Sequence, residues 1–146
     1  MPFAASITGS RTPAEDPAFL AFLRAAGAAE GEAGLEVDYR TQQLRRQERR
    51  RLPTFGWRIQ EGQEGIANDY EDRGFLGSGA RQVAQMRDRR KVMHEQGEFQ
   101  AEIGDKISDL NYNAALDVAK ARRGVADESL LARDRIAERG AYAGVY

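Results

Sequence analysis

The side chains in this sequence that could do chemistry gather around its single histidine. Two acids follow His94, and a helix would place one of them, Glu98, beside the imidazole. A metal site needs several ligands in a fixed geometry, so we interpret His94 as a surface residue. The segment Gly77-Ser78-Gly79 is similar to a nucleophile elbow, but no strand pattern precedes it. The sequence therefore predicts no catalytic residue, no metal site and no cofactor.

A basic cluster between residues 45 and 51 is the other candidate site. Clustered guanidinium groups bind phosphates and release counterions, which makes DNA a candidate ligand. The net charge of the chain is only -1, and we expect no aromatic side chains interleaved with the arginines to stack on bases. We therefore favour a solvated or subunit-facing surface and keep DNA contact as the alternative. The cluster consists of Arg45, Arg46, Arg49, Arg50 and Arg51, with Glu48 as the intervening acid.

Composition argues for a protein that completes its burial in an assembly. Charged residues make up 31% of the 146 residues, and the mean hydropathy is -0.65. The large apolar residues are spread along the chain and do not form strand-like runs, so a single copy has little material for a core. The chain has no cysteine, and no apolar window is long enough to predict a membrane span.

Helix signals divide the chain into four parts of an extended, all-α helical hairpin. Residues 1–11 lack periodicity and predict an irregular docking arm. Residues 12–53 predict a helical segment that begins at Thr12-Pro13, weakens over residues 27–34 and stops at Pro53. Residues 54–122 predict the hairpin, with a long second helix. Residues 123–146 predict a break at Gly124, a short helix and a tail.

The corner of the hairpin is predicted at residues 74–78. Gly74 follows a helical pattern and can adopt the left-handed conformation that closes a helix. Ser78 can cap the next helix by accepting a hydrogen bond from an amide of its first turn. Phe75 and Leu76 lie between them, and we expect these two side chains to pin the corner onto a neighbouring element or subunit.

Apolar residues at spacings of seven, four and three predict a coiled-coil seam between the two arms. We expect a bend or a crowded crossing near Gly97 and Gly104, which interrupt the second arm. The arms also carry opposite charge, because residues 60–72 hold acids without a lysine or arginine and residues 81–91 hold five bases and one acid. Antiparallel pairing of the arms would bring these charges together. The predicted packing residues are Ile59, Gly62, Ile66, Tyr70, Met86, Met93, Ile103, Ile107 and Leu110.

The motifs of the hairpin follow one another in a distinctive order. A helix with Gly65-Ile66 and Tyr70 leads into Arg73-Gly74-Phe75-Leu76-Gly77-Ser78-Gly79-Ala80, and the charged helix that follows carries Asp109-Leu110-Asn111-Tyr112. This order resembles that of small structural proteins of tailed bacteriophage virions, of the minor tail or neck type. The resemblance covers residues 54–122.

The resemblance implies a non-enzymatic part of a virion, present in several copies, whose helices pack between larger neighbours. Its partners would then be other virion proteins and copies of itself, and its location the virion, assembled in the host cytoplasm. Two alternatives stay open. In the first, the chain is an internal or ejected virion protein that aids genome delivery. In the second, it is a helical DNA-binding protein that uses the face from Arg45 to Arg51.

Overall fold

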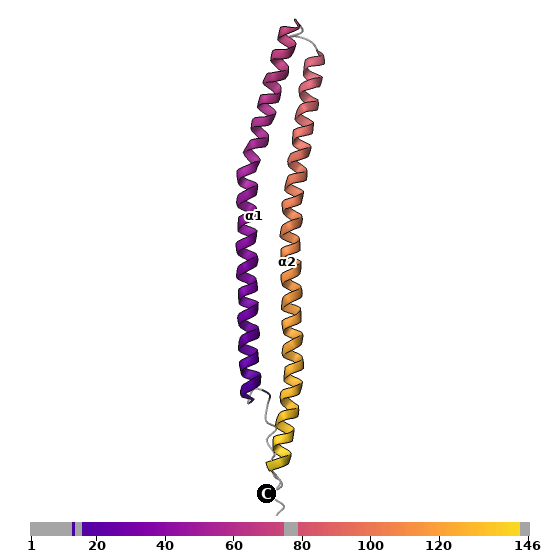
Figure 1. Cartoon of the computed structure of the whole chain (residues 1–146). Helices are drawn as coiled ribbons and strands as arrows, with labels where there is room; N and C mark the ends of the chain where they lie inside the picture. Colours follow the sequence, from indigo (N-terminus) through magenta and orange to yellow (C-terminus); the bar gives the residue numbers. More distant parts are fainter. Residues whose placement is uncertain (1–12, 14–15, 75–78, 144–146) are drawn as a thin grey trace, which may run out of the picture. The chain divides into compact units, whose positions relative to one another are not determined.

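The described part of the chain forms two long helices. The computed structural model describes residue 13, residues 16–74 and residues 79–143, and in these residues α1 spans Pro17–Asp72 and α2 spans Gly79–Ala143 (Figure 1). The predicted all-α, hairpin-like fold is therefore confirmed. The predicted arm at residues 1–11, the predicted cap at Thr12, and Phe75, Leu76 and Ser78 lie outside the described residues.

The end of α1 closes on Gly74. This glycine has a φ of 77°, in the left-handed region where a residue with a Cβ would be strained. Its amide donates a hydrogen bond to the carbonyl of Glu71 at 2.9 Å, and the amide of Arg73 donates to the carbonyl of Asp69 at 3.3 Å. The helix end predicted from the position of Gly74 is confirmed.

The chain divides into two compact units, which we describe one at a time. Residues 37–112 form the hairpin unit, and residues before 37 together with those after 112 form the terminal unit. The core of the hairpin unit is built from Phe55, Val92, Phe99 and Ile103. The rings of Phe55 and Phe99 lie 5.9 Å apart between centroids and are tilted, a favourable arrangement for aromatic pairs. Leu44, Ile59 and Ile107 pack against this core.

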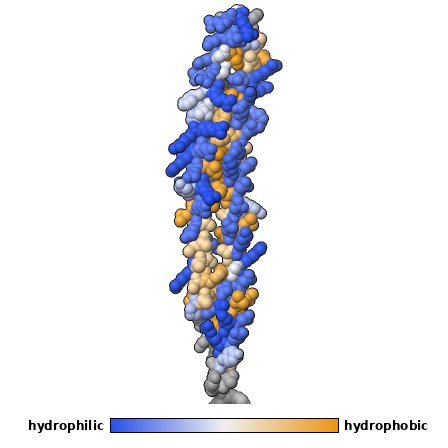
Figure 2. Space-filling view, viewed as in Figure 1, coloured by the Kyte–Doolittle hydropathy of each residue, from blue (hydrophilic) through white to orange (hydrophobic). Residues whose placement is uncertain are grey.

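The buried and half-buried residues of α2 in the hairpin unit recur with a period of eleven residues. Asp88, Phe99 and Leu110 illustrate the repeat, which alternates spacings of four, four and three. Eleven residues make three turns at about 3.67 residues per turn, close to the natural 3.6 of the α-helix. Apolar side chains line the boundary between the helices, and polar side chains cover their flanks (Figure 2). The repeating positions in α2 are Arg81, Gln85, Asp88, Val92, Gln96, Phe99, Ile103, Ile107 and Leu110.

The predicted packing residues fall partly on this seam. Met86 and Met93 do not, because both are more than half exposed, so the prediction that they pack in the seam is wrong. Met86 and Met93 are seven residues apart, and each heptad step rotates by about 20° relative to an ideal helix. The remaining predicted residues are buried or half-buried: Ile59, Gly62, Ile66, Tyr70, Ile103, Ile107 and Leu110.

The predicted stop at Pro53 is also wrong, because α1 runs through this residue. Proline removes one hydrogen bond from a helix interior, yet Leu44 on one side of Pro53 and Ile59 on the other pack against the same core. The hydroxyl of Thr54 donates a hydrogen bond to the carbonyl of Arg51 at 2.6 Å, which gives one backbone acceptor near the proline a partner. Tertiary packing therefore keeps the helix continuous.

The glycines do not break the helices either. Residues 27–34 are helical, since the alanines that surround the three glycines there are strong helix formers. In the terminal unit α2 continues through Gly124, where a Cβ would lie 3.5 Å from the ring of Phe22. The crowding expected near Gly97 and Gly104 is absent, because within the described residues no atom comes within 4 Å of a Cβ built at either glycine.

Candidate interaction surface on α1

The arginines of the cluster differ in whether their side chains contact other described residues of the hairpin unit. Arg45 donates to a carboxylate oxygen of Glu48 at 2.9 Å, and Nε of Arg49 donates to the carbonyl of Arg45 at 3.5 Å. The guanidinium of Arg51 lies over the ring of Phe99, 4.7 Å from its centroid. Three of the five arginines are therefore engaged within the hairpin unit itself.

Arg46 and Arg50 are the arginines left for a ligand or a partner. Both are exposed, and neither forms an ion pair with the residues that the structure describes. They lie one turn apart on the outward face of α1, where their side chains border a shallow hollow of about 540 Å³. The hollow is lined by Gln43, Arg46, Gln47, Arg50, Arg51 and Thr54.

Aromatic side chains share this outward face with the two arginines. The eleven-residue period places Tyr39 in register with Arg50, and Arg46 in register with Trp57. Tyr39 is 62% exposed and Trp57 is 67% exposed. No aromatic residue lies between the arginines, as expected, but Tyr39 and Trp57 lie on the same face, seven residues before Arg46 and seven residues after Arg50. We call this surface the outer stripe; it consists of Tyr39, Gln43, Arg46, Arg50, Thr54, Trp57, Glu61, Gly65, Asn68 and Asp72.

Charge pairing across the hairpin unit is visible at Arg58 and Glu95. Their side chains form an ion pair between the two helices at 2.6 Å. The hydrogen bond from Arg58 is the main cause that holds the pKa of Glu95 below its usual value. Between residues 60–72 and 81–91 the side chain of Gln85 donates to the carbonyl of Gln63 at 3.1 Å. The ion pairing expected between these two segments stays a prediction.

The histidine lies on the surface of α2. Nε2 of His94 is 3.5 Å from a carboxylate oxygen of Glu98, one turn further along, and both side chains are mostly exposed. No group of three or more metal-ligand side chains occurs in residues 13, 16–74 and 79–143. In the same part of the chain, neither helix is apolar enough over a sufficient length to cross a bilayer.

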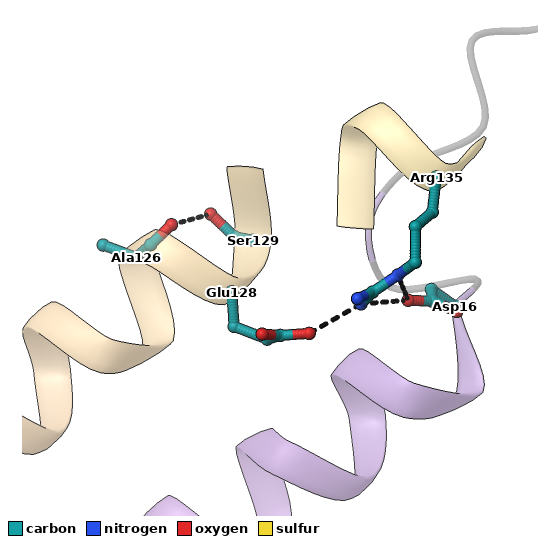
Figure 3. A network of polar contacts seen from close by, with 5 residues as sticks. All are labelled: Asp16, Ala126, Glu128, Ser129 and Arg135. Carbon is teal, nitrogen blue, oxygen red and sulfur yellow. Dashed lines mark hydrogen bonds and ion pairs between the residues drawn. The ribbon is translucent and has the colours of Figure 1, made fainter. Parts of the chain in front are cut away.

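A partly buried ion cluster in the terminal unit has no counterpart in the sequence-based predictions. Asp16 caps α1, where its carboxylate accepts a hydrogen bond from the amide of Ala18 and Pro17 occupies the first helical position. Arg135 donates to this carboxylate at 2.8 Å and to Glu128 at 2.6 Å (Figure 3). Asp16 is 3% exposed, and the hydrogen bond from Arg135 is the main cause that lowers its pKa. In the sequence, Asp16 followed by Pro17 is the signal that could have predicted this helix start, because aspartate is a favoured cap and proline a favoured first residue.

Comparisons of the chain with protein families, with curated protein sequences and with solved structures find no match. The geometry of the described residues is therefore the basis for assigning a role. It offers exposed faces for protein contact, of which the outer stripe is the most distinctive.

Proposed function

We propose that this chain is a non-enzymatic structural component of a tailed phage virion. In this role it packs as a helical hairpin between neighbouring subunits of the tail or of the head-tail junction. One observation carries the proposal: large apolar side chains are exposed along both helices. Neighbouring subunits that cover such side chains stabilise the assembly. The exposed side chains include Leu20, Phe22, Leu23, Leu35, Tyr39, Trp57, Val83, Met86, Met93, Tyr112, Leu116, Leu130, Leu131 and Tyr142.

The resemblance of residues 54–122 to virion proteins supplies the phage context of this proposal. The partners are other virion proteins and further copies of the chain, and the location is the virion. The arm at residues 1–11 and the C-terminal tail latch onto neighbours, while the hairpin unit fills the space between them. The open surroundings of Gly97 and Gly104 support this role, because small exposed residues let another helix approach closely.

DNA binding is the second candidate, and Arg46 and Arg50 are the observation that favours it. Two phosphate contacts give a slope of log K against log salt of only about -2, far weaker than that of proteins with many contacts. Such weak, salt-sensitive binding through two phosphate contacts is compatible with a structural virion protein that makes a minor contact with the genome. Retention on DNA with a steeper salt dependence would favour a dedicated DNA-binding protein.

Quantitative mass spectrometry of purified particles tests the proposed function. Particles are produced in cells infected with the phage whose genome encodes this sequence, and they are then separated into heads and tails. We expect a constant number of copies per particle, enriched in the tail or junction fraction, with an abundant host protein as the control for contamination. An internal or ejected protein would instead leave the particle when the genome is released. Detection in infected cells but not in particles would refute the proposal.

A further inference from the structure

The outer stripe changes its charge along its length. Its first half carries Arg46 and Arg50, and its second half carries Glu61 and Asp72. Trp57 lies between the two halves. Arg46, Arg50 and Glu61 form no ion pair with described residues, so their charges are available to a partner. A surface that is basic at one end and acidic at the other is complementary to a copy of itself turned end for end.

We propose that two copies of this chain pair antiparallel along the outer stripe, about a two-fold axis that passes between Thr54 and Trp57. Arg50 then faces Glu61 of the second copy, and the two-fold axis repeats this ion pair. Trp57 faces Thr54 of the second copy and covers the end of the hollow beside Arg50.

The same alignment matches the remaining positions of the stripe. Arg46 faces Gly65 of the second copy, where no described atom lies within 4 Å of a built Cβ and a guanidinium has room. The hydroxyl of Tyr39 faces the carboxylate of Asp72 and can donate a hydrogen bond to it. Gln43 and Asn68 then lie opposite each other as an amide pair. Every member of the stripe thus meets a residue of compatible size, charge or hydrogen-bonding capacity.

The size of the stripe indicates a reversible dimer. From Tyr39 to Asp72 the helix extends over about 50 Å, at roughly 1.5 Å per residue. With a helix about 10 Å wide, the stripe covers on the order of 500 Å² on each copy. A total of about 1,000 Å² lies at the lower end of specific interfaces. We therefore expect a dimer that dissociates on dilution.

The partner proposed here is a second copy of the chain. This proposal rests on the proposed function in one respect, because both require copies of the chain to pack together. Their failures are distinguishable. Particles that contain the chain, combined with a purified chain that does not dimerise through this stripe, would refute the dimer alone. A charge-dependent dimer with no chain in particles would refute the virion role alone.

A charge swap in the full-length chain tests the dimer. Arg50→Glu and Glu61→Arg each place like charges at both repeated pairs, so each should weaken dimerisation by about tenfold or more. The double variant Arg50→Glu with Glu61→Arg restores both pairs with their signs reversed, and we expect its dimer affinity to return close to that of the original chain. Sedimentation velocity over a dilution series measures the affinity.

Two controls and one reporter make the result specific. Arg89→Glu and Asp105→Arg make the same changes in net charge at exposed positions of α2 and should leave the dimer intact. Trp57 is the single tryptophan of the chain, so its emission should shift to shorter wavelength as the dimer forms. Circular dichroism confirms that each variant keeps its helix content. A chain that is monomeric at every concentration, single variants that dimerise normally, or a double variant no better than the singles would each overturn the proposal.

Discussion

The contact between Gly62 and Asp88 gives the sharpest prediction about the hairpin unit. A Cβ placed at Gly62 would clash with Oδ2 of Asp88, whereas a Cβ at Gly65 has no neighbour within 4 Å among the described residues. The same Oδ2 is buried and has no hydrogen-bond partner among the described residues. The pair therefore combines two unfavourable features, a glycine inside a helix and an unpaired polar atom, and the carboxylate of Asp88 occupies the space that a side chain at residue 62 would need.

The magnitudes follow from this geometry. Replacing a helical glycine by alanine stabilises by about 1 kcal/mol, so Gly65→Ala should gain that amount in full. Gly62→Ala gains the same propensity but must push the carboxylate of Asp88 aside, and an off-rotamer side chain costs roughly 0.5–1.5 kcal/mol. We expect almost no net gain at Gly62. Asp88→Ala removes the unpaired oxygen, whose burial costs about 1–3 kcal/mol, and Gly62→Ala should then regain its full effect.

Native-state hydrogen exchange measures these differences without assuming that the whole chain unfolds at once. The readout is the opening free energy of peptides that cover residues 55–70 in the original chain, the variants Gly62→Ala, Gly65→Ala and Asp88→Ala, and the double variant of Gly62 and Asp88. A coupling of about 1 kcal/mol between Gly62 and Asp88 is expected, and contacting residues typically show couplings of this size. Equal gains from Gly62→Ala with and without Asp88 would refute the reasoning.

Three further predictions concern the core, the proline and the ion cluster. Ile103→Ala should destabilise the hairpin unit by about 2–5 kcal/mol in urea unfolding, because Ile103 is 1% exposed, whereas Met93→Ala on the exposed face should cost far less. Pro53→Ala should stabilise α1 by up to about 3 kcal/mol and slow hydrogen exchange over residues 49–57; unchanged exchange would contradict this. The lowered pKa of Asp16 means that its ion cluster stabilises the terminal unit above the usual carboxyl pKa of 3.8 and loses this effect as pH falls below it. Arg135→Gln should reduce that acid dependence, because it removes the largest of the contacts that lower the pKa of Asp16, and unfolding measured by circular dichroism at neutral and acidic pH would show this.

Local signals in the sequence predicted the helices and their corner but not their continuity. Gly74 could be placed correctly because a left-handed residue at a helix end depends on a few neighbouring residues. Pro53 and Gly124 predict helix ends because their intrinsic costs in a helix interior, about 3 and 1 kcal/mol, can be read from the sequence. The compensating contacts come from residues distant along the chain, such as the ring of Phe22 beside Gly124, and no local pattern reveals them.

The candidate surface depended on the period used to read the helix. The five arginines are close together in the sequence and are therefore expected to form one face. In the structure the guanidinium of Arg51 lies over the ring of Phe99, whereas Arg46 and Arg50 are exposed on the outward face. A heptad pattern also places Met93 in the seam, although this side chain is exposed. Each step of seven residues is about 20° short of two full turns, and this angular error accumulates along a long helix. A step of eleven keeps the register in both helices, and it connects Arg46 with Trp57 on the outside just as it connects Phe99 with its seam neighbours on the inside. The period that defines the core therefore also defines the surface opposite to it, and this opposite surface is where contacts with other copies have to be tested.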